Sequence, residues 1–285
     1  MIDVYEPTEN QYYSCMLARF ILFTLLTTLL TSSPEMASAE NPPQEKLAPD
    51  VLERAREIHA KFEGQKGYVA QFGDSITYSM AFWSPMSWDD PAKYLPADDD
   101  AQPLASWKNI IKGARDKGEK FGNYSGWKIG DLLPSIDAVL ARDKPETAII
   151  KIGTNDINDG QVPESYRAGL EKVIAKCIAA HCVPMLNTIP PRRDREDAVA
   201  QINTIIREIA SAEKIPLIDY HAHCLQQRPG QTWDGTLVSE DGVHPTGGRS
   251  NIYTPANLQV SGYALRNWIN FLALRLLHFE VYEKR

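Results

Sequence analysis

A short apolar strand runs directly into a glycine turn in the stretch Tyr68-Val69-Ala70-Gln71-Phe72-Gly73-Asp74-Ser75. A glycine at the end of a buried strand permits a sharp turn. Asp and Ser are also common in ordinary turns, so the tripeptide alone is compatible with a purely structural role. The stretch therefore predicts a strand that ends at an exposed serine, and the rest of the sequence must show what that serine does.

Apolar strands alternate with helical patterns along the rest of the chain. Further strands are predicted at 147–152, 183–188 and 216–219, and helices at 51–63, 129–142, 163–180, 195–214 and 260–279. This alternation indicates a parallel sheet with helices on both faces. We therefore expect a flavodoxin-like three-layer α/β/α sandwich with a central parallel sheet, which binds its ligands at the carboxyl ends of the strands.

Composition narrows the class of protein. The chain has 285 residues, of which 43% are hydrophobic and 24% charged, which is ordinary for a globular protein. The formal net charge of −7 argues against a nucleic-acid-binding protein, because such proteins carry a basic surface. The same charge favours a neutral or weakly charged ligand.

The N-terminal region has the pattern of a secretory signal. Arg19 precedes the apolar run 20–30, and the small residues Ala37-Ser38-Ala39 follow. The run is too short for a membrane span, which needs roughly 20 apolar residues. We expect a signal peptide at 1–39 and a secreted or periplasmic protein without stable membrane insertion after cleavage. An uncleaved membrane anchor is the alternative.

Acidic residues among the first fifteen positions fit a signal poorly, so we expect translation to begin at Met16. A polar tail is predicted at 40–49. Three cysteines remain after cleavage, and an odd number leaves at least one thiol unpaired. The predicted strands place Cys182 and Cys224 roughly 15 Å or more apart, beyond the ~7 Å limit for a disulfide. We expect buried free thiols at these positions and at Cys177.

A second conspicuous segment lies late in the chain, at Asp241-Gly242-Val243-His244-Pro245. A serine nucleophile needs a general base, usually histidine, and the base needs an orienting carboxylate. The spacing places Asp241 and His244 on one short loop, with glycine and proline to fix the turn. A surface turn with a solvated histidine is the alternative.

Two further segments supply hydrogen-bond donors. Ile152-Gly153-Thr154-Asn155-Asp156 follows the second predicted strand, and Ser125-Gly126-Trp127-Lys128-Ile129-Gly130-Asp131-Leu132-Leu133 leads into a helix. The side-chain amide of Asn155 and the backbone N–H of Gly126 are donors of the kind that stabilise a developing oxyanion.

These four segments, in this order, resemble the four motif blocks of the GDSL/SGNH hydrolase superfamily, an SGNH-type esterase group. Ser75, Gly126, Asn155 and His244 match its four signature residues. The resemblance implies Ser75 as nucleophile, His244 as general base and acid, and Asp241 as the residue that orients His244. It also implies an oxyanion hole formed by the backbone N–H groups of Ser75 and Gly126 and the amide of Asn155. No cofactor and no metal are implied.

Against this family pattern, we predict one domain at 50–285 with insertions at about 78–125 and 247–259, both near the site. The first insertion contains three tryptophans and an acidic run: Trp83, Trp88, Trp107 and Asp98-Asp99-Asp100. The tryptophans either stack on sugar rings or pack the insertion onto the domain. The acidic run either binds calcium or forms a solvated loop.

Three weaker features each have a structural alternative. His221-Ala222-His223-Cys224 has metal-ligand residue types but no clear fourth ligand, and a strand-end loop is expected. Arg192, Arg193 and Arg195 flank the loop after the third strand and either meet an anionic substrate or form a solvated face. The last helix carries an apolar stripe that is expected to face the core: Leu265, Trp268, Ile269, Leu272, Leu276 and Phe279.

Taken together, the sequence predicts a secreted serine esterase that hydrolyses a carboxylic ester by a Ser-His-Asp acyl-enzyme mechanism. The favoured partner is a small-molecule or glycan ester, with a carbohydrate O-acetyl group as the favoured target. A lipolytic enzyme (lysophospholipase or thioesterase) and a catalytically silent glycan-binding module are the alternatives. The sequence assigns no oligomeric state.

Overall fold

The computed structural model of the chain describes residues 47–88 and 107–283. All of them belong to one compact unit, Asn41–Arg285. Several predictions fall outside the described residues: the signal peptide 1–39, most of the tail, the acidic run 98–100 and the side chain of Trp107. Export and the domain boundaries therefore stay predictions.

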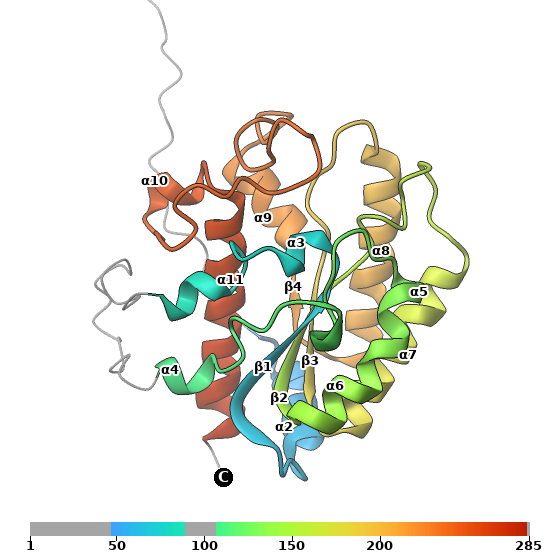
Figure 1. The fold of residues 1–285 in the computed structure, drawn as a ribbon, viewed down its shortest axis with the longest axis vertical. Coiled ribbons are helices and arrows are strands. Elements are labelled where there is room, and N and C mark those ends of the chain that lie inside the picture. Colours follow the sequence, from blue (N-terminus) through green and yellow to red (C-terminus); the bar gives the residue numbers. More distant parts are fainter. Residues whose placement is uncertain (1–46, 89–106, 284–285) are drawn as a thin grey trace, which may run out of the picture. The chain divides into compact units, whose positions relative to one another are not determined.

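Four parallel strands form the central sheet in the order β1-β2-β3-β4 (Figure 1). Their bounds are Gln65–Gly73 for β1, Pro145–Lys151 for β2, Val183–Asn187 for β3 and Leu217–Ile218 for β4. Every residue of β2 and β3 is buried. Continuous burial is typical of parallel strands that are covered on both faces, and the predicted parallel sheet is confirmed.

An irregular segment, residues 110–124, runs along the outer edge of β1. Parallel bridges join Tyr68 to Lys112 and Gly73 to Asn123. The side-chain amide of Asn123 also donates to the Gln71 carbonyl at 2.9 Å. If this segment is counted as the second strand, the sheet has the order 2-1-3-4-5 of flavodoxin-like folds. The later part of the range expected as an insertion thus borders the sheet.

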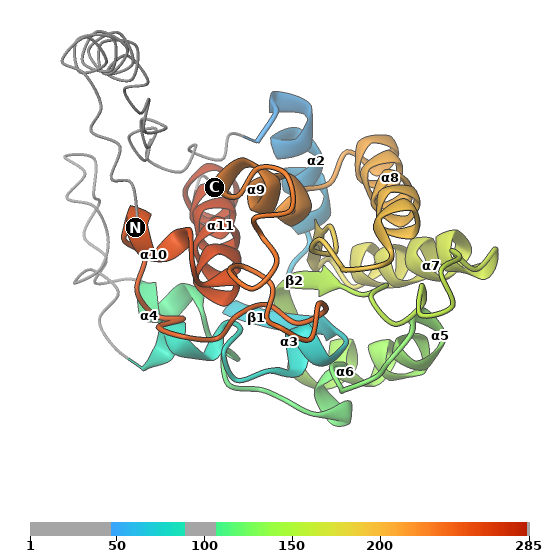
Figure 2. The ribbon, with the colours of Figure 1, turned by 90° about the horizontal axis from the view of Figure 1, so that it is seen from above.

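Helices cover both faces of the sheet, as predicted (Figures 1 and 2). Right-handed crossovers between neighbouring parallel strands place the connecting helices on one face. These are α6 (Ile136–Asp143), α7 (Ser165–Ala179) and α8 (Glu196–Glu213). The opposite face is covered by α2 (Pro49–His59) and α11 (Gly262–Leu277), and α9 (Tyr220–Gln227) packs against α11.

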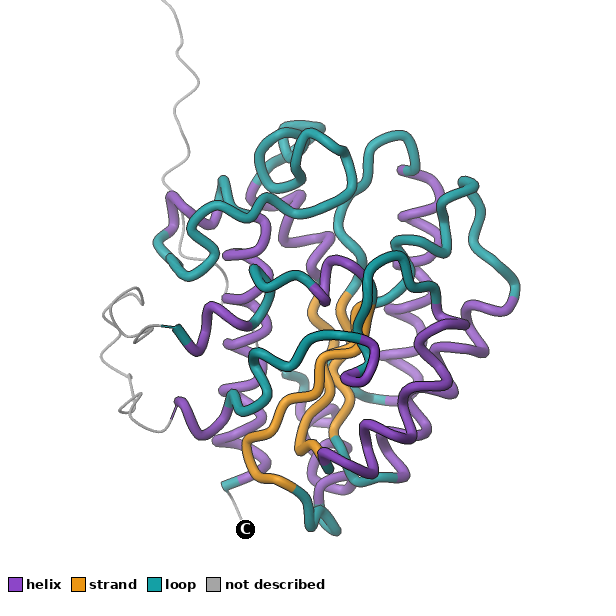
Figure 3. The backbone as a smooth tube through the Cα atoms, viewed as in Figure 1, coloured by secondary structure: helices purple, strands orange, loops and turns teal. Residues whose placement is uncertain are grey.

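Figure 3 shows teal loops above the orange strands. The remaining helical segments of the described residues are short, and most of them lie in connections. Their bounds are α3 (Ser75–Tyr78), η2 (Ser84–Ser87), α4 (Trp107–Ile110), η5 (Glu119–Phe121), α5 (Ile129–Leu132), η6 (Leu133–Ser135), α10 (Pro255–Leu258) and η7 (His278–Tyr282). No helix among the described residues is long and apolar enough to span a membrane.

Two predicted elements differ in the structure. The single helix expected at 129–142 is divided into α5, η6 and α6, because Pro134 has no N–H to continue the helical hydrogen bonds. His221–Cys224 was expected in a loop and instead lies in α9. Asp219 caps this helix, since its Oδ1 accepts from the Ala222 N–H at 3.1 Å.

The last helix, α11, is buried on more sides than one apolar stripe predicts. Asn267 is fully buried. Its side-chain oxygen accepts from the backbone N–H of Trp83 at 2.8 Å, and its amide nitrogen donates to the carbonyls of Ala81 and Ser250. Described parts of both ranges expected as insertions therefore contact this helix. Trp83 is fully buried, which confirms a packing role for it, whereas Trp88 is 49% exposed.

The predicted free thiols are confirmed. Cys177, Cys182 and Cys224 are all buried and unpaired. Burial raises the pKa of the Cys182 and Cys224 thiols, so both stay protonated at neutral pH.

Gly73 ends β1 where two backbones approach closely. A Cβ atom there would lie 2.1 Å from the Lys151 carbonyl oxygen and 2.5 Å from Thr77 Oγ1. We expect Gly73→Ala to lower the free energy of unfolding by about 1–3 kcal/mol through overpacking, measured by urea denaturation. Gly130→Ala is the matched control, because no atom apart from its chain neighbours and its own helix backbone lies within 4 Å of that Cβ position. Equal stability of the two variants would contradict this prediction.

Candidate active site

The turn that carries the predicted nucleophile joins β1 to α3. Asp74 caps the helix, and its Oδ1 accepts from the Ile76 N–H at 3.0 Å. An aspartate at this position satisfies a backbone donor that has no partner within the helix. Asp74, Ile76 and Thr77 are buried, whereas Ser75 is half-buried. The serine is thus the accessible residue of an otherwise enclosed turn.

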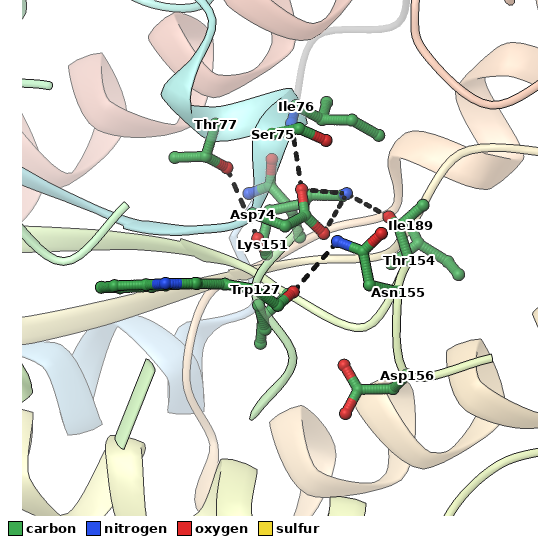
Figure 4. A network of polar contacts seen from close by, with 12 residues as sticks. Asp74, Ser75, Ile76, Thr77, Trp127, Lys151, Thr154, Asn155, Asp156 and Ile189 are labelled. Carbon is green, nitrogen blue, oxygen red and sulfur yellow. Dashed lines mark hydrogen bonds and ion pairs between the residues drawn. The ribbon is translucent and has the colours of Figure 1, made fainter. Parts of the chain in front are cut away.

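A buried ion pair lies beneath this turn (Figure 4). Lys151 Nζ, at the end of β2, is 2.9 Å from each carboxylate oxygen of Asp74 and also hydrogen-bonds Thr154 Oγ1. Both charged side chains are fully buried. Burial lowers the pKa of Lys151 to about 8, and the charge of Asp74 opposes this shift. Sheet register creates the contact, since Gly73 pairs with Lys151.

Two more basic side chains hold the far end of the same turn. Arg266, which is fully buried on α11, donates to the Ile76 carbonyl at 3.0 Å and to Thr77 Oγ1 at 3.2 Å. Lys117 donates to the Thr77 carbonyl at 2.7 Å. Burial lowers the pKa of Arg266 to about 10, which leaves it charged at neutral pH. These contacts satisfy carbonyl groups that a four-residue helix leaves without partners.

The structure brings Ser75, His244 and Asp241 into one chain of hydrogen bonds. Ser75 Oγ lies 2.8 Å from His244 Nε2, and His244 Nδ1 lies 2.6 Å from Asp241 Oδ2. A carboxylate can only accept a hydrogen bond, so Nδ1 donates to it. Nε2 is then the acceptor and faces the serine hydroxyl. This is the tautomer that a general base for Ser75 requires.

Asp241 is held as a carboxylate. Partial burial acts to raise its pKa, but hydrogen bonds from the backbone N–H groups of His244 and Val243 outweigh it. The pKa therefore lies well below its usual range. Oδ1 accepts from these two groups at 2.9 and 2.8 Å, and from Ser239 Oγ at 2.8 Å. Asp241 thus carries a negative charge beside His244 at neutral pH.

Arg193 attaches the histidine loop to the segment after β3. Its guanidinium binds both carboxylate oxygens of Asp234 at 2.6 and 2.7 Å and donates to the Glu240 carbonyl at 3.0 Å. Its backbone N–H donates to the Gly242 carbonyl at 2.9 Å. Gly242 has φ of +72°, and a Cβ there would lie 2.7 Å from Arg193. The loop is therefore fixed on both sides of Asp241.

Gly126 and Asn155 lie on two loops that are tied together. Asn155 Nδ2 donates to the Trp127 carbonyl at 3.0 Å (Figure 4). The buried carboxylate of Asp156 accepts from the Ile129 N–H at 3.1 and 3.2 Å. Burial raises the pKa of Asp156 to about 6. Gly126 has φ of +79°, a conformation that favours glycine. One N–H of the Asn155 amide is used in the contact with Trp127.

Sequence reasoning did not single out Lys151, Arg266 or Arg193 as supports of the site. Lys151 had a visible signal, because it is a charged residue at the end of an otherwise apolar strand. Arg266 likewise interrupts an apolar helix. In the described part of the chain, no group of three or more His, Cys, Asp or Glu side chains is placed to hold a metal ion.

An α/β sheet that presents a serine, a histidine and a carboxylate in hydrogen-bond order at its carboxyl edge defines a serine hydrolase. A model of the GDSL-like Lipase/Acylhydrolase family matches residues 72–247, which is more than half of the chain and contains all four segments. The chain belongs to this family. It is an ester-bond hydrolase, as the sequence predicted.

Solved structures with similar folds carry related names. The lipase/acylhydrolase from Enterococcus faecalis has a TM-score of 0.51 and 18% identity, and the match covers 76% of this chain and 98% of that one. The esterase EstA from Pseudoalteromonas sp. has a TM-score of 0.45 and 17% identity, and the match covers 72% of this chain and 99% of that one. An acetyl xylan esterase, AlAXEase, has a TM-score of 0.45 and 19% identity, and the match covers 67% of this chain and 97% of that one. No curated protein matches the chain.

The ion pair of Lys151 and Asp74 makes a measurable prediction. Lys151→Met should lower the free energy of unfolding by about 3–5 kcal/mol, because it leaves Asp74 as a buried unpaired charge. Adding Asp74→Asn removes that charge and keeps an acceptor for the Ile76 N–H, so it should restore part of the loss. Urea denaturation of the four proteins of this double-mutant cycle gives the coupling. A double variant no more stable than Lys151→Met would contradict the assignment.

Proposed function

We propose that the chain is a serine esterase in which Ser75 is the nucleophile, His244 the general base and acid, and Asp241 the residue that orients His244. The observation that best supports this proposal is the pair of contacts that join Ser75 Oγ to His244 and His244 to Asp241, at 2.8 and 2.6 Å. His244 takes the hydroxyl proton as the serine oxygen attacks the ester carbonyl. The alcohol leaves with that proton, and an acyl-enzyme remains.

The same residues complete the reaction. Water enters after the alcohol has left, and His244 accepts its proton as the oxygen attacks the acyl-enzyme. The carboxylic acid is released and Ser75 regains its proton. Each step moves one proton between His244 and an oxygen, so the reaction needs only the ester and water.

We assign the oxyanion hole to the backbone N–H groups of Ser75 and Gly126 and to the amide of Asn155. Neither backbone N–H donates a hydrogen bond to another described residue. Asn155 is held in place by its bond to the Trp127 carbonyl. A preorganised donor of this kind is worth roughly 3–4 kcal/mol of transition-state stabilisation.

For the substrate, we propose a short-chain ester, such as an acetyl ester, of a carbohydrate or a similar polar alcohol. A row of aromatic side chains supports this class. Tyr78 is 37% exposed and stands 5.2 Å from Tyr124, which is 38% exposed and 6.2 Å from Trp127, measured between ring centroids. Tyr78 is three residues after Ser75, and Trp127 follows Gly126. Aromatic faces beside the nucleophile offer flat apolar area to a sugar ring.

Loss of the Ser75 hydroxyl should abolish turnover without unfolding the protein. We expect Ser75→Ala to reduce kcat for 4-nitrophenyl acetate by at least about 10³-fold. Ser135→Ala is the control, because that hydroxyl lies on η6 and donates to the Leu132 carbonyl. Hydrolysis by Ser75→Ala at the wild-type rate would refute the nucleophile assignment and leave a glycan-binding module as the alternative.

An acyl-length series separates the two esterase classes. Each buried CH₂ group contributes about 0.8 kcal/mol, so a lipolytic site gains roughly fourfold in kcat/KM per added methylene. We expect no such gain from acetyl to octanoyl 4-nitrophenyl esters, and the highest kcat/KM for the acetyl ester. A steady increase with chain length would replace the carbohydrate assignment by a lipolytic one.

A further inference from the structure

Three arginines follow β3, and the structure separates them into two kinds. Arg193 forms a two-pronged ion pair with Asp234 and supports the histidine loop. Arg192 and Arg195 bind only backbone carbonyl groups. Arg192 Nη1 donates to the Thr154 carbonyl at 2.5 Å, and Arg195 donates to the Asn158 carbonyl at 3.0 and 3.2 Å. The arginines are therefore not one solvated face.

Neither Arg192 nor Arg195 has a carboxylate partner among residues 47–88 and 107–283. Arg192 is half-buried, and a guanidinium has five N–H donors, of which one carbonyl satisfies only one. Burial and the neighbouring charge of Arg195 lower the pKa of Arg192, and the charge of Asp74 only partly opposes this shift. A partly desolvated cation beside a second cation is stabilised when an anion binds. Other guanidinium groups of the described residues are of both kinds: Arg207 pairs with the carboxylate of Asp219, whereas Arg228 binds the Gln259 carbonyl.

The position of Arg192 relates it to the reacting groups. Its partner carbonyl belongs to Thr154, which precedes Asn155 and contacts Lys151 through Oγ1. The next residue in the chain, Arg193, donates from its backbone to Gly242 in the histidine loop. Arg192 thus lies between the loop that carries the oxyanion donor and the loop that carries the base. This is the carboxyl edge of the sheet, where α/β folds bind ligands.

We propose that Arg192, with Arg195 beside it, binds an anionic group of the ester substrate, so that the preferred substrates are esters carrying a carboxylate or a similar anion near the scissile bond. The planar guanidinium fork fits such a group through two parallel hydrogen bonds. This inference rests on the proposed esterase function and deepens it by naming a substrate class. The anion belongs either to the alcohol or to the acyl part, and the two differ only in which side of the ester lies over Arg192.

Two pairs of stable esters test whether the anion belongs to the alcohol or to the acyl part of the substrate. The members of each pair are matched in shape and differ in charge. For the alcohol side the pair is 4-acetoxybenzoate and 4-acetoxybenzamide. For the acyl side it is monomethyl succinate and methyl succinamate. Hydrolysis is followed by proton release in a pH-stat at neutral pH. The wild-type enzyme should prefer the anionic member of one pair by roughly 10- to 100-fold in kcat/KM, the range expected for a charged hydrogen bond. The pair that shows the preference identifies which part of the ester, alcohol or acyl, carries the anion that Arg192 binds.

Arg192→Gln should bring the anionic-to-neutral ratio of that pair close to one, and Arg192→Lys should keep part of it. A general loss of activity through the Thr154 contact cancels in this ratio. Arg54→Gln is the matched control, because Arg54 pairs with Glu57 on the exposed side of α2 and should keep the wild-type ratio. Added salt should lower the wild-type ratio by screening the half-buried charge.

The outcomes are distinguishable. A wild-type enzyme that hydrolyses the neutral esters through Ser75 but prefers neither anionic ester overturns the Arg192 proposal and leaves the esterase intact. An anionic preference that survives in Arg192→Gln also overturns it. If Arg192→Gln does not fold, Arg195→Gln must lower the ratio for the proposal to stand. Failure of every ester with the wild-type enzyme refutes the proposed function itself.

Discussion

The ammonium group of Lys151 holds together the parts of this protein on which the site depends. It binds the carboxylate of Asp74, which precedes Ser75, and the hydroxyl of Thr154, which precedes Asn155. One buried cation therefore fixes the spacing of the two loops that follow β1 and β2. A charge in such an environment tolerates few alternative geometries, because displacement from its partners exposes the full desolvation cost. Strand register and this ion pair set how the turn at Ser75 lies relative to the loop of Asn155.

Short-range patterns in the sequence predict most of the fold and the candidate catalytic residues. The strand-to-glycine turn at 73–75 and the three-residue spacing of Asp241 and His244 are short-range patterns, and short-range patterns are visible without a structure. The supports of the site are not local. Arg193 meets Asp234, and Arg266 meets Ile76, across many residues of chain. The edge segment 110–124 also has no strand pattern of its own and is defined by its partner β1.

Net charge describes the whole surface of the protein and not the surroundings of a single site. The overall charge of −7 favoured a neutral or weakly charged ligand, and that expectation averages over the whole surface. Charge acts within about 8–10 Å at physiological salt, so the groups near the reacting atoms decide. There the structure places Arg192 and Arg195 beside loops on which Asp74 and Asp156 are buried and already bonded, while Asp159 and Asp194 are exposed. The same local view separates Arg193, which is neutralised by Asp234, from its two neighbours.

The three buried thiols give this hydrolase a set of internal reporters. Because no disulfide links the described residues, folding of this region does not depend on an oxidant. The protein can therefore be prepared under reducing conditions. A thiol reagent reaches Cys177, Cys182 or Cys224 only when the surrounding structure opens. The first two lie where α7 leads into β3, and the third lies on α9. Alkylation rates at these positions would therefore map separately how two regions of the molecule open.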